Sequence, residues 1–134
     1  MSGGMGEPVI RVTAMPADTN PYGGVFGGWL MSQMALGAGS TVSRYASGTA
    51  VVIGATDFRF PGAMDVGDEL SIYTTIAKEG NTSLNIEVRG IARERNTEAT
   101  KEVCSGTFTF VVIDETGRPR AVKDRPALKT GQEL

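Results

Sequence analysis

Residues 15–46 read MPADTNPYGGVFGGWLMSQMALGAGSTVSRYA, a loop with two prolines and two glycines followed by a helical segment. Residues at spacings of three or four predict one packed helix face, made of Phe26, Leu30, Met34, Gly37, Thr41 and Tyr45. We predict a helix from Phe26 to about Ala46, with Gly48 as its stop. The glycine-rich turn before it exposes backbone N–H groups at the positive end of the helix dipole, where they can hold an oxygen that becomes negative.

The rest of the chain alternates apolar and polar residues with a period of two, which is typical of strands. The predicted strands are 7–14, 50–60, 69–77, 83–93 and 101–113. Several are joined by short turns, so we expect an antiparallel sheet, and the small residues of Gly37 to Ser40 would let it approach the helix closely. The predicted fold class is α+β, a hotdog fold in which a five-stranded antiparallel sheet wraps one long helix. A single domain would cover 1–134, with 1–6 as a loose leader and 119–134 as an irregular tail.

The composition excludes several classes of function. The 134 residues carry a net charge of -2, which argues against nucleic-acid binding, and no apolar run is long enough for a membrane span. The single cysteine, Cys104, rules out an internal disulfide and fits a reducing cytoplasm. The chain has no histidine, which excludes His-dependent catalysis, so we expect no metal site and chemistry based on carboxylates, amides, hydroxyls, lysines or backbone groups.

Four sequence pieces follow one another along the chain: MPADTN with VFGGWLMSQM, TDF at 56–58 with VGDEL at 66–70, EGNTS at 79–83 and GRPR at 117–120. With them, the chain from Met15 to Val122 resembles the YciA-like acyl-CoA thioesterases, which are hotdog proteins. The resemblance implies hydrolysis of an acyl-CoA to a free acid and CoA, with CoA only as part of substrate and product and no other cofactor. It also implies a homodimer that joins two five-stranded sheets, further assembly into a trimer of dimers, and active sites at the dimer interface.

The resemblance assigns roles to three parts of residues 15–46. The backbone N–H groups of Gly27 and Gly28 would polarise the thioester carbonyl; the alternative is a glycine pair that only permits tight packing. The amide of Asn20 would orient the water or the carbonyl; the alternative is an Asx turn leading into Pro21. The family's general base is a carboxylate on the helix, and that position is Ala35 here. The chain is then an engineered variant, an enzyme with a relocated base, or a protein that binds acyl-CoA without rapid hydrolysis.

Asp57 is the best candidate for a relocated base, because a carboxylate is costly to bury in an apolar strand. Alternation places it on the strand face of Ile53, Ala55 and Arg59, so an Asp57–Arg59 ion pair is the structural alternative. Asp18 is a weaker candidate.

Two further segments are candidates for CoA binding. The turn Gly80-Asn81-Thr82-Ser83 could hold phosphate oxygens, and in similar proteins this loop borders the CoA nucleotide; alone, it reads as an ordinary hairpin turn. The tail is basic and could meet the CoA phosphates across a subunit boundary or simply be solvated. Its cationic residues are Arg118, Arg120, Lys123, Arg125 and Lys129.

Overall fold

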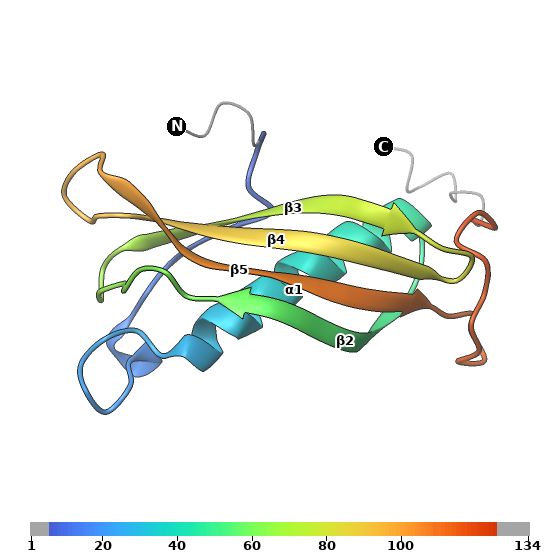
Figure 1. Ribbon diagram of the computed structural model, residues 1–134, viewed down its shortest axis with the longest axis horizontal. Helices are drawn as coiled ribbons and strands as arrows, with labels where there is room; N and C mark the ends of the chain where they lie inside the picture. The colour runs from blue at the N-terminus through green and yellow to red at the C-terminus, as the bar shows by residue number, and fades with distance from the viewer. Residues whose placement is uncertain (1–5, 126–134) are drawn as a thin grey trace.

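The computed structural model describes residues 6–125. Its elements are β1 (Ile10–Thr13), the 3-10 turn η1 (Pro16–Asp18), α1 (Gly27–Ala46), β2 (Ala50–Arg59), β3 (Glu69–Glu79), β4 (Ser83–Arg93) and β5 (Thr100–Val112). The strands form a five-stranded antiparallel sheet in the order β1-β3-β4-β5-β2, and α1 lies along one face of it (Figure 1). The predicted α+β architecture, one long helix against an antiparallel sheet, is confirmed.

The strands begin and end close to their predicted positions, except at β1. This strand was expected from residue 7 but begins at Ile10. Pro8 explains the difference, because proline has no N–H to donate to a strand ladder. Val9 still donates its N–H to the carbonyl of Ile72 at 2.8 Å, so the pairing with β3 continues one residue beyond the strand.

The buried face of α1 differs from the predicted one. It consists of Leu30, Met34, Gly37, Ala38, Val42 and Ala46. The placement of Phe26 and Tyr45 on this face was wrong, since their side chains are 53% and 37% exposed. Phe26 precedes the helix with an extended backbone, and the Tyr45 hydroxyl donates to Glu79. The predicted close approach of the sheet is confirmed at Gly37, where an added Cβ would lie 2.9 Å from side-chain carbons of Ile72 and Val9.

Helix α1 ends at Ala46, as predicted, but Gly48 is not the residue that stops it. Ser47, with a φ of 53°, takes the left-handed conformation that ends the helix. Gly48 is needed for a different reason, because a Cβ there would lie 2.6 Å from Nη2 of Arg120. The segment after β5 is irregular as far as Arg125, as predicted, yet Val122 is completely buried. The tail therefore packs against the end of the helix.

Cys104 lies on β5 in the hydrophobic core and is completely buried. Burial raises the pKa of its thiol to about 12. Because the thiolate is the reactive species, we expect Cys104 to resist iodoacetamide at mildly alkaline pH in the native protein. Mass spectrometry after labelling with and without denaturant checks this, and stoichiometric labelling of the native chain would contradict it.

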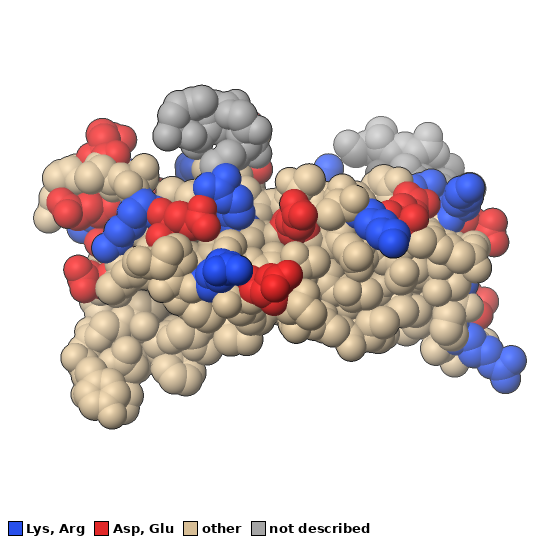
Figure 2. All heavy atoms as spheres, in the orientation of Figure 1, with Lys and Arg blue, Asp and Glu red and all other residues tan. Residues whose placement is uncertain are grey.

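The outer edge of β2 is apolar and exposed. Val51, Val52 and Ile53 are 43%, 48% and 62% exposed, and β2 pairs with β5 on one side only. In Figure 2, charged side chains gather mainly over the β3–β4–β5 side, and the lower rim of the view carries few. Long apolar strand edges are sites of strand pairing with another chain.

None of the helices within residues 6–125 has the length and apolar character needed to cross a bilayer.

Candidate active site

The loop before α1 is held by a dense set of backbone hydrogen bonds. The Asp18 carboxylate accepts from the N–H of Met15 at 2.9 Å, and the Asp18 carbonyl accepts from the N–H of Phe26 at 2.7 Å. Val25 donates its N–H to the carbonyl of Met64 at 3.0 Å, which ties the loop to the segment after β2. Asp18 therefore organises this loop through its carboxylate, which is the expected behaviour of a short acidic side chain beside a turn.

The side chain of Asn20 forms the Asx turn that was the structural alternative and leaves its Nδ2 open. Its Oδ1 accepts from the N–H of Tyr22 at 2.7 Å, which is the Asx turn offered as the structural alternative. Its Nδ2 donates to no group within residues 6–125, so one face of the amide is fixed and the other is open. A side-chain amide held in this way can donate a hydrogen bond to a carbonyl oxygen. The catalytic role of Asn20 stays a prediction.

The first turn of α1 presents two open donors. Phe26 precedes the helix and makes no side-chain cap, while its carbonyl accepts from the N–H groups of Trp29 at 3.0 Å and Leu30 at 3.3 Å. The N–H groups of Gly27 and Gly28 have no acceptor in the described part of the chain. Unpaired donors at a helix N-terminus, reinforced by the helix dipole, suit an oxygen that acquires negative charge.

Ala35 lies two turns further along α1 and is partly buried against the core. The sequence of α1 contains no Asp or Glu at any position. The helix therefore offers no carboxylate to activate a water, and a general base has to come from another element.

Asp57 occupies an irregular position in β2. Thr56 pairs with Thr107 and Arg59 with Ser105, so Asp57 and Phe58 both lie opposite Gly106 in a β-bulge. Asp57 has a φ of 57°, a left-handed conformation that costs most side chains about 1–2 kcal/mol and that Asp and Asn tolerate best. Bulges of this kind are common beside active sites, where they redirect a side chain.

The bulge corrects the predicted orientation of Asp57, because regular alternation with Ile53, Ala55 and Arg59 ends there. Asp57 is exposed, and the structure contains no ion pair between it and Arg59, both of which are described. Phe58 packs on Gly106, where an added Cβ would overlap its ring, and its ring centroid lies 5.3 Å from that of Phe108, with the two rings tilted by 59°. Phe58 thus belongs to the packed side of β2, and the Asp57 carboxylate stays available to a water or a ligand.

The predicted nucleotide-binding turn connects β3 and β4. Gly80 donates its N–H to the carbonyl of Ser83 at 2.8 Å, while the carbonyls of Asn81 and Thr82 accept from Val122 and Val112, each at 2.8 Å. Within residues 6–125, the N–H groups of Asn81 and Thr82 have no acceptor, so they could receive phosphate oxygens. This role of Gly80 to Ser83 stays a prediction.

Arg120 has a clear structural task. Its Nη2 donates to the carbonyl of Ala46 at 2.7 Å, and its Nη1 donates to the carbonyls of Ala121 and Asp124, both at 3.2 Å. Arg125 likewise donates to the carbonyl of Tyr45 at 2.6 Å and stacks on its ring. Cations at the C-terminal end of a helix are stabilised by its dipole. Both residues therefore anchor the tail to α1, which leaves Arg120 less free for CoA phosphates than predicted.

Arg118 and the other tail cations differ from these two anchors. The backbone of Arg118 closes the Asp114 turn, and its exposed side chain makes no hydrogen bond or ion pair to residues 6–125. Three hydrogen-bond donors, from backbone and side chain, surround the Asp114 carboxylate. The hydrogen bond from Thr116 is the main cause of the lowered pKa of this carboxylate. Lys123 is exposed, and Lys129 lies outside the described residues. Arg118 remains the best placed of the predicted phosphate ligands.

The candidate residues fall into two groups at opposite ends of α1. Asn20, Gly27 and Gly28 lie at its start. Strand β2 runs back to the same end of the molecule (Figure 1), and the Val25–Met64 hydrogen bond ties the segment after β2 to the loop. The turn at Gly80 to Ser83 and the tail lie at its C-terminal end, as the Tyr45–Glu79 and Arg120–Ala46 contacts show. An α-helix of 20 residues spans about 30 Å. One protomer therefore does not bring the thioester candidates and the phosphate candidates together.

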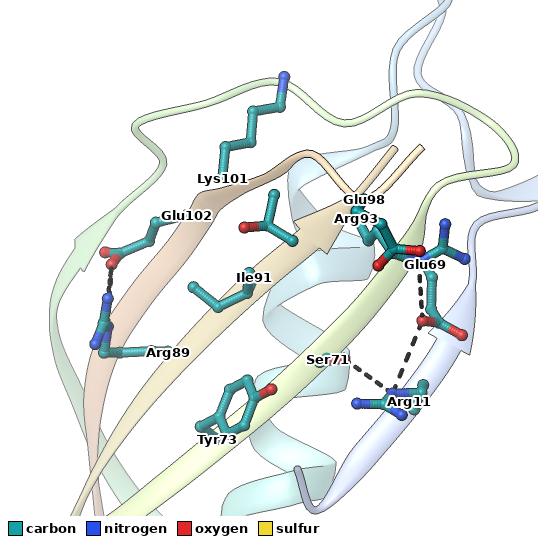
Figure 3. A pocket seen from close by; sticks show the side chains of 11 residues that line it. Arg11, Glu69, Ser71, Tyr73, Arg89, Ile91, Arg93, Glu98, Lys101 and Glu102 are labelled. Atoms are coloured by element: carbon teal, nitrogen blue, oxygen red, sulfur yellow. Dashed lines mark hydrogen bonds and ion pairs between the residues drawn. The ribbon is translucent and has the colours of Figure 1, made fainter. Parts of the chain in front are cut away.

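A hollow of about 560 Å³ lies on the sheet face that points away from α1 (Figure 3). Ser71 and Tyr73 line it, because the alternate residues Leu70 and Ile72 face the core. Five of its charged groups form ion pairs: Glu69 lies 3.8 Å from Arg11 and 3.6 Å from Arg93, and Arg89 lies 2.6 Å from Glu102. No predicted site residue belongs to it.

Phe26 belongs to this site, although the sequence predicted it on the buried face of the helix. Its ring lies on Gly28, because an added Cβ there would overlap it, and the ring is half exposed instead of buried with the helix face. In the sequence, Phe26 stands directly before two glycines at the start of the helix. The glycines leave room for its aromatic side chain to fold back onto the first helical turn, and this could have indicated its position.

Comparison with known proteins identifies the family of this chain and its fold. The thioesterase superfamily matches residues 22–99. An uncharacterised acyl-CoA thioester hydrolase of Zymomonas mobilis is 48% identical over 114 residues, which cover 85% of this chain and 76% of that protein. The acyl-CoA thioester hydrolase YciA of Escherichia coli is 35% identical over 120 residues, 87% of this chain and 91% of that protein. The crystal structure of a hexameric hotdog-fold thioesterase of Campylobacter jejuni has a TM-score of 0.83 at 32% identity, covering 87% of this chain and 90% of that one.

The predicted resemblance and the predicted hotdog fold are therefore both confirmed. The family match covers α1, β2, β3 and β4, and with them Gly27, Gly28, Asp57 and the turn from Gly80 to Ser83. This chain belongs to the thioesterase superfamily, among the YciA-like acyl-CoA thioester hydrolases.

Proposed function

We propose that this chain hydrolyses acyl-CoA thioesters to a free acid and CoA at the start of α1. The observation that carries the proposal is the pair of open N–H groups at Gly27 and Gly28, which follow the loop that holds the Asn20 amide by its Oδ1 alone. The relatives named as acyl-CoA thioester hydrolases supply the substrate class. The proposed chemistry uses no metal and no cofactor other than the CoA carried by the substrate.

The N–H groups of Gly27 and Gly28 would receive the thioester oxygen. Attack on the carbonyl carbon converts this oxygen into an oxyanion, and donors fixed in advance stabilise it without further reorganisation. The open Nδ2 of Asn20 would help to position the carbonyl or the water. Removing one donor of this type from a hydrolase typically lowers kcat by about 10²–10³-fold.

Asp57 would supply the base. Its carboxylate takes a proton from a water, and the resulting hydroxide attacks the carbonyl carbon. Collapse of the tetrahedral intermediate breaks the C–S bond, and the leaving thiolate of CoA receives the proton from Asp57. The reaction consumes one water and needs no other reactant. Ala35 cannot perform this step, which is why the base is assigned to β2.

A second copy of the chain would complete the site. The unpaired, apolar edge of β2 suits antiparallel pairing with the same strand of another protomer, which would bury Val51 to Ile53. The hexameric state of the Campylobacter jejuni protein supports assembly into a trimer of dimers. In such an assembly, the Gly80 to Ser83 turn and Arg118 of one subunit could meet the nucleotide of a CoA held by another. We assign the enzyme to the cytoplasm, in keeping with its free, buried Cys104.

We expect Ile53→Lys to disrupt this assembly. The side chain of Ile53 is 62% exposed on the isolated protomer, so a lysine fits the monomer but would place a charge in the paired edge. Analytical ultracentrifugation should show a smaller species with unchanged circular dichroism. Thr49→Lys, an exposed position just before β2, is the matched control. An Ile53→Lys protein of the same mass as the unsubstituted assembly would contradict this interface.

The direct test of the function is a hydrolysis assay with acyl-CoAs of increasing chain length, following release of the CoA thiol. The buried Cys104 should not interfere with thiol detection. Turnover above the buffer reaction for at least one chain length supports the proposal. Binding of acyl-CoA without turnover at any chain length would instead identify a binding protein.

A further inference from the structure

The two glycines that begin α1 have different surroundings. A Cβ added to Gly28 would overlap the Phe26 ring, with further ring carbons at 3.0 and 3.1 Å. A Cβ added to Gly27 would meet no heavy atom within 4 Å in the described part of the protomer. The ring therefore closes one side of the first helical turn, and the space beside Gly27 is open.

The backbone of Phe26 is held by hydrogen bonds on both sides, and its ring lies against Gly28. Its N–H donates to the carbonyl of Asp18 at 2.7 Å, and its carbonyl accepts from Trp29 and Leu30. The ring remains 53% exposed although it touches Gly28, so it does not serve the protomer's core. An apolar ring beside two unpaired N–H groups keeps water from one side of them, which strengthens their interaction with a developing charge.

We infer that Phe26 is a positioning residue for thioester hydrolysis and that the two glycines have separate tasks. Gly28 lacks a side chain because the Phe26 ring lies against it. Gly27 lacks a side chain because the thioester carbonyl lies beside it, in the open space. This inference rests on the proposed function and adds which glycine faces the substrate.

The test compares Gly27→Ala, Gly28→Ala, Phe26→Ala and the double variant Phe26→Ala/Gly28→Ala by kcat, KM and Tm. Gly27→Ala should lower kcat/KM by about 10²-fold, the loss expected when a reacting group is displaced by about 1 Å, with an unchanged Tm. Gly28→Ala should lower both Tm and kcat/KM. Adding Phe26→Ala to it should recover about tenfold in kcat/KM and part of the lost Tm, because the two residues are in contact.

Two further variants serve as controls. Gly39→Ala makes the same substitution in the same helix, where the new Cβ would lie 3.8 Å from the Phe110 ring, an ordinary contact. It should leave kcat/KM unchanged. Phe26→Ala alone should lower kcat more than it changes KM, and Phe26→Tyr should retain kcat because it keeps the ring.

The inference is wrong if Gly27→Ala is as active as Gly39→Ala, or if Phe26→Ala does not relieve the defect of Gly28→Ala. A Gly27→Ala protein that falls apart into smaller species would also overturn it, since that glycine would then face another subunit. If the unsubstituted chain turns over no acyl-CoA, the proposed function fails instead. The Tm values of Phe26→Ala, Gly28→Ala and the double variant would then still show whether the Phe26 ring is the reason for a glycine at residue 28.

Discussion

Asp57→Asn is expected to lower kcat for acyl-CoA hydrolysis by about 10²–10⁴-fold, the usual contribution of a general base. The reason is that α1 contains no carboxylate, while Asp57 lies in a β-bulge at the end of the sheet where α1 begins. An amide at this position keeps the shape of the side chain but cannot take a proton from water. Steady-state hydrolysis of the preferred acyl-CoA measures the effect.

The left-handed backbone at residue 57 allows Asn to replace Asp without added strain. Asn adopts a φ near 57° as readily as Asp does, so the Tm should be preserved. Asp124→Asn, an exposed carboxylate at the opposite end of α1, is the matched control and should retain full activity. Wild-type kcat in Asp57→Asn would remove Asp57 from the mechanism.

Ala35→Asp is expected to raise kcat by about 10²-fold or more, because it adds a second base at the position that the family resemblance assigns to one. The effect should be largest in the Asp57→Asn background, where Ala35→Asp should restore hydrolysis. Ala35 is partly buried, so some loss of Tm is expected from placing a charge there.

Ala35→Asn separates the charge from the change in size. It has nearly the same volume as the aspartate variant and no basic carboxylate, so it should leave kcat at the level of the unsubstituted chain or below. Equal activity of Ala35→Asp and Ala35→Asn would show that residue 35 lies too far from the thioester to act as a base.

Much of the fold could be predicted because its signals are local. Period-two alternation fixed β4 at Ser83–Arg93, and the small residues of α1 predicted the close approach that Gly37 makes to Ile72. The errors arose where distant residues decide the conformation. Gly48 was expected to stop α1, but Ser47 takes the left-handed conformation that ends the helix, and the Arg120 guanidinium lies beside Gly48.

The candidate site was harder to predict for the same reason. The residues Thr56-Asp57-Phe58 do not predict a bulge, because the extra residue is not a glycine, and the Phe58 ring packs on Gly106, which is distant in the sequence. At Asn20 the Asx turn is confirmed; it uses Oδ1 and leaves Nδ2 open, so it does not exclude the catalytic role, which stays a prediction. The thioester candidates and the phosphate candidates are separated by the length of α1. This separation could be found only from the folded structure.

A crystal structure of the unsubstituted protein with CoA bound tests the central claim most directly. The account predicts that the CoA sulfur lies beside Gly27, within reach of the two open N–H groups, with the Asp57 carboxylate of the same or a neighbouring subunit close enough to hold a water against it. It predicts the phosphates at a Gly80 to Ser83 turn of another subunit. A sulfur remote from both Gly27 and every Asp57 in the assembly would contradict it.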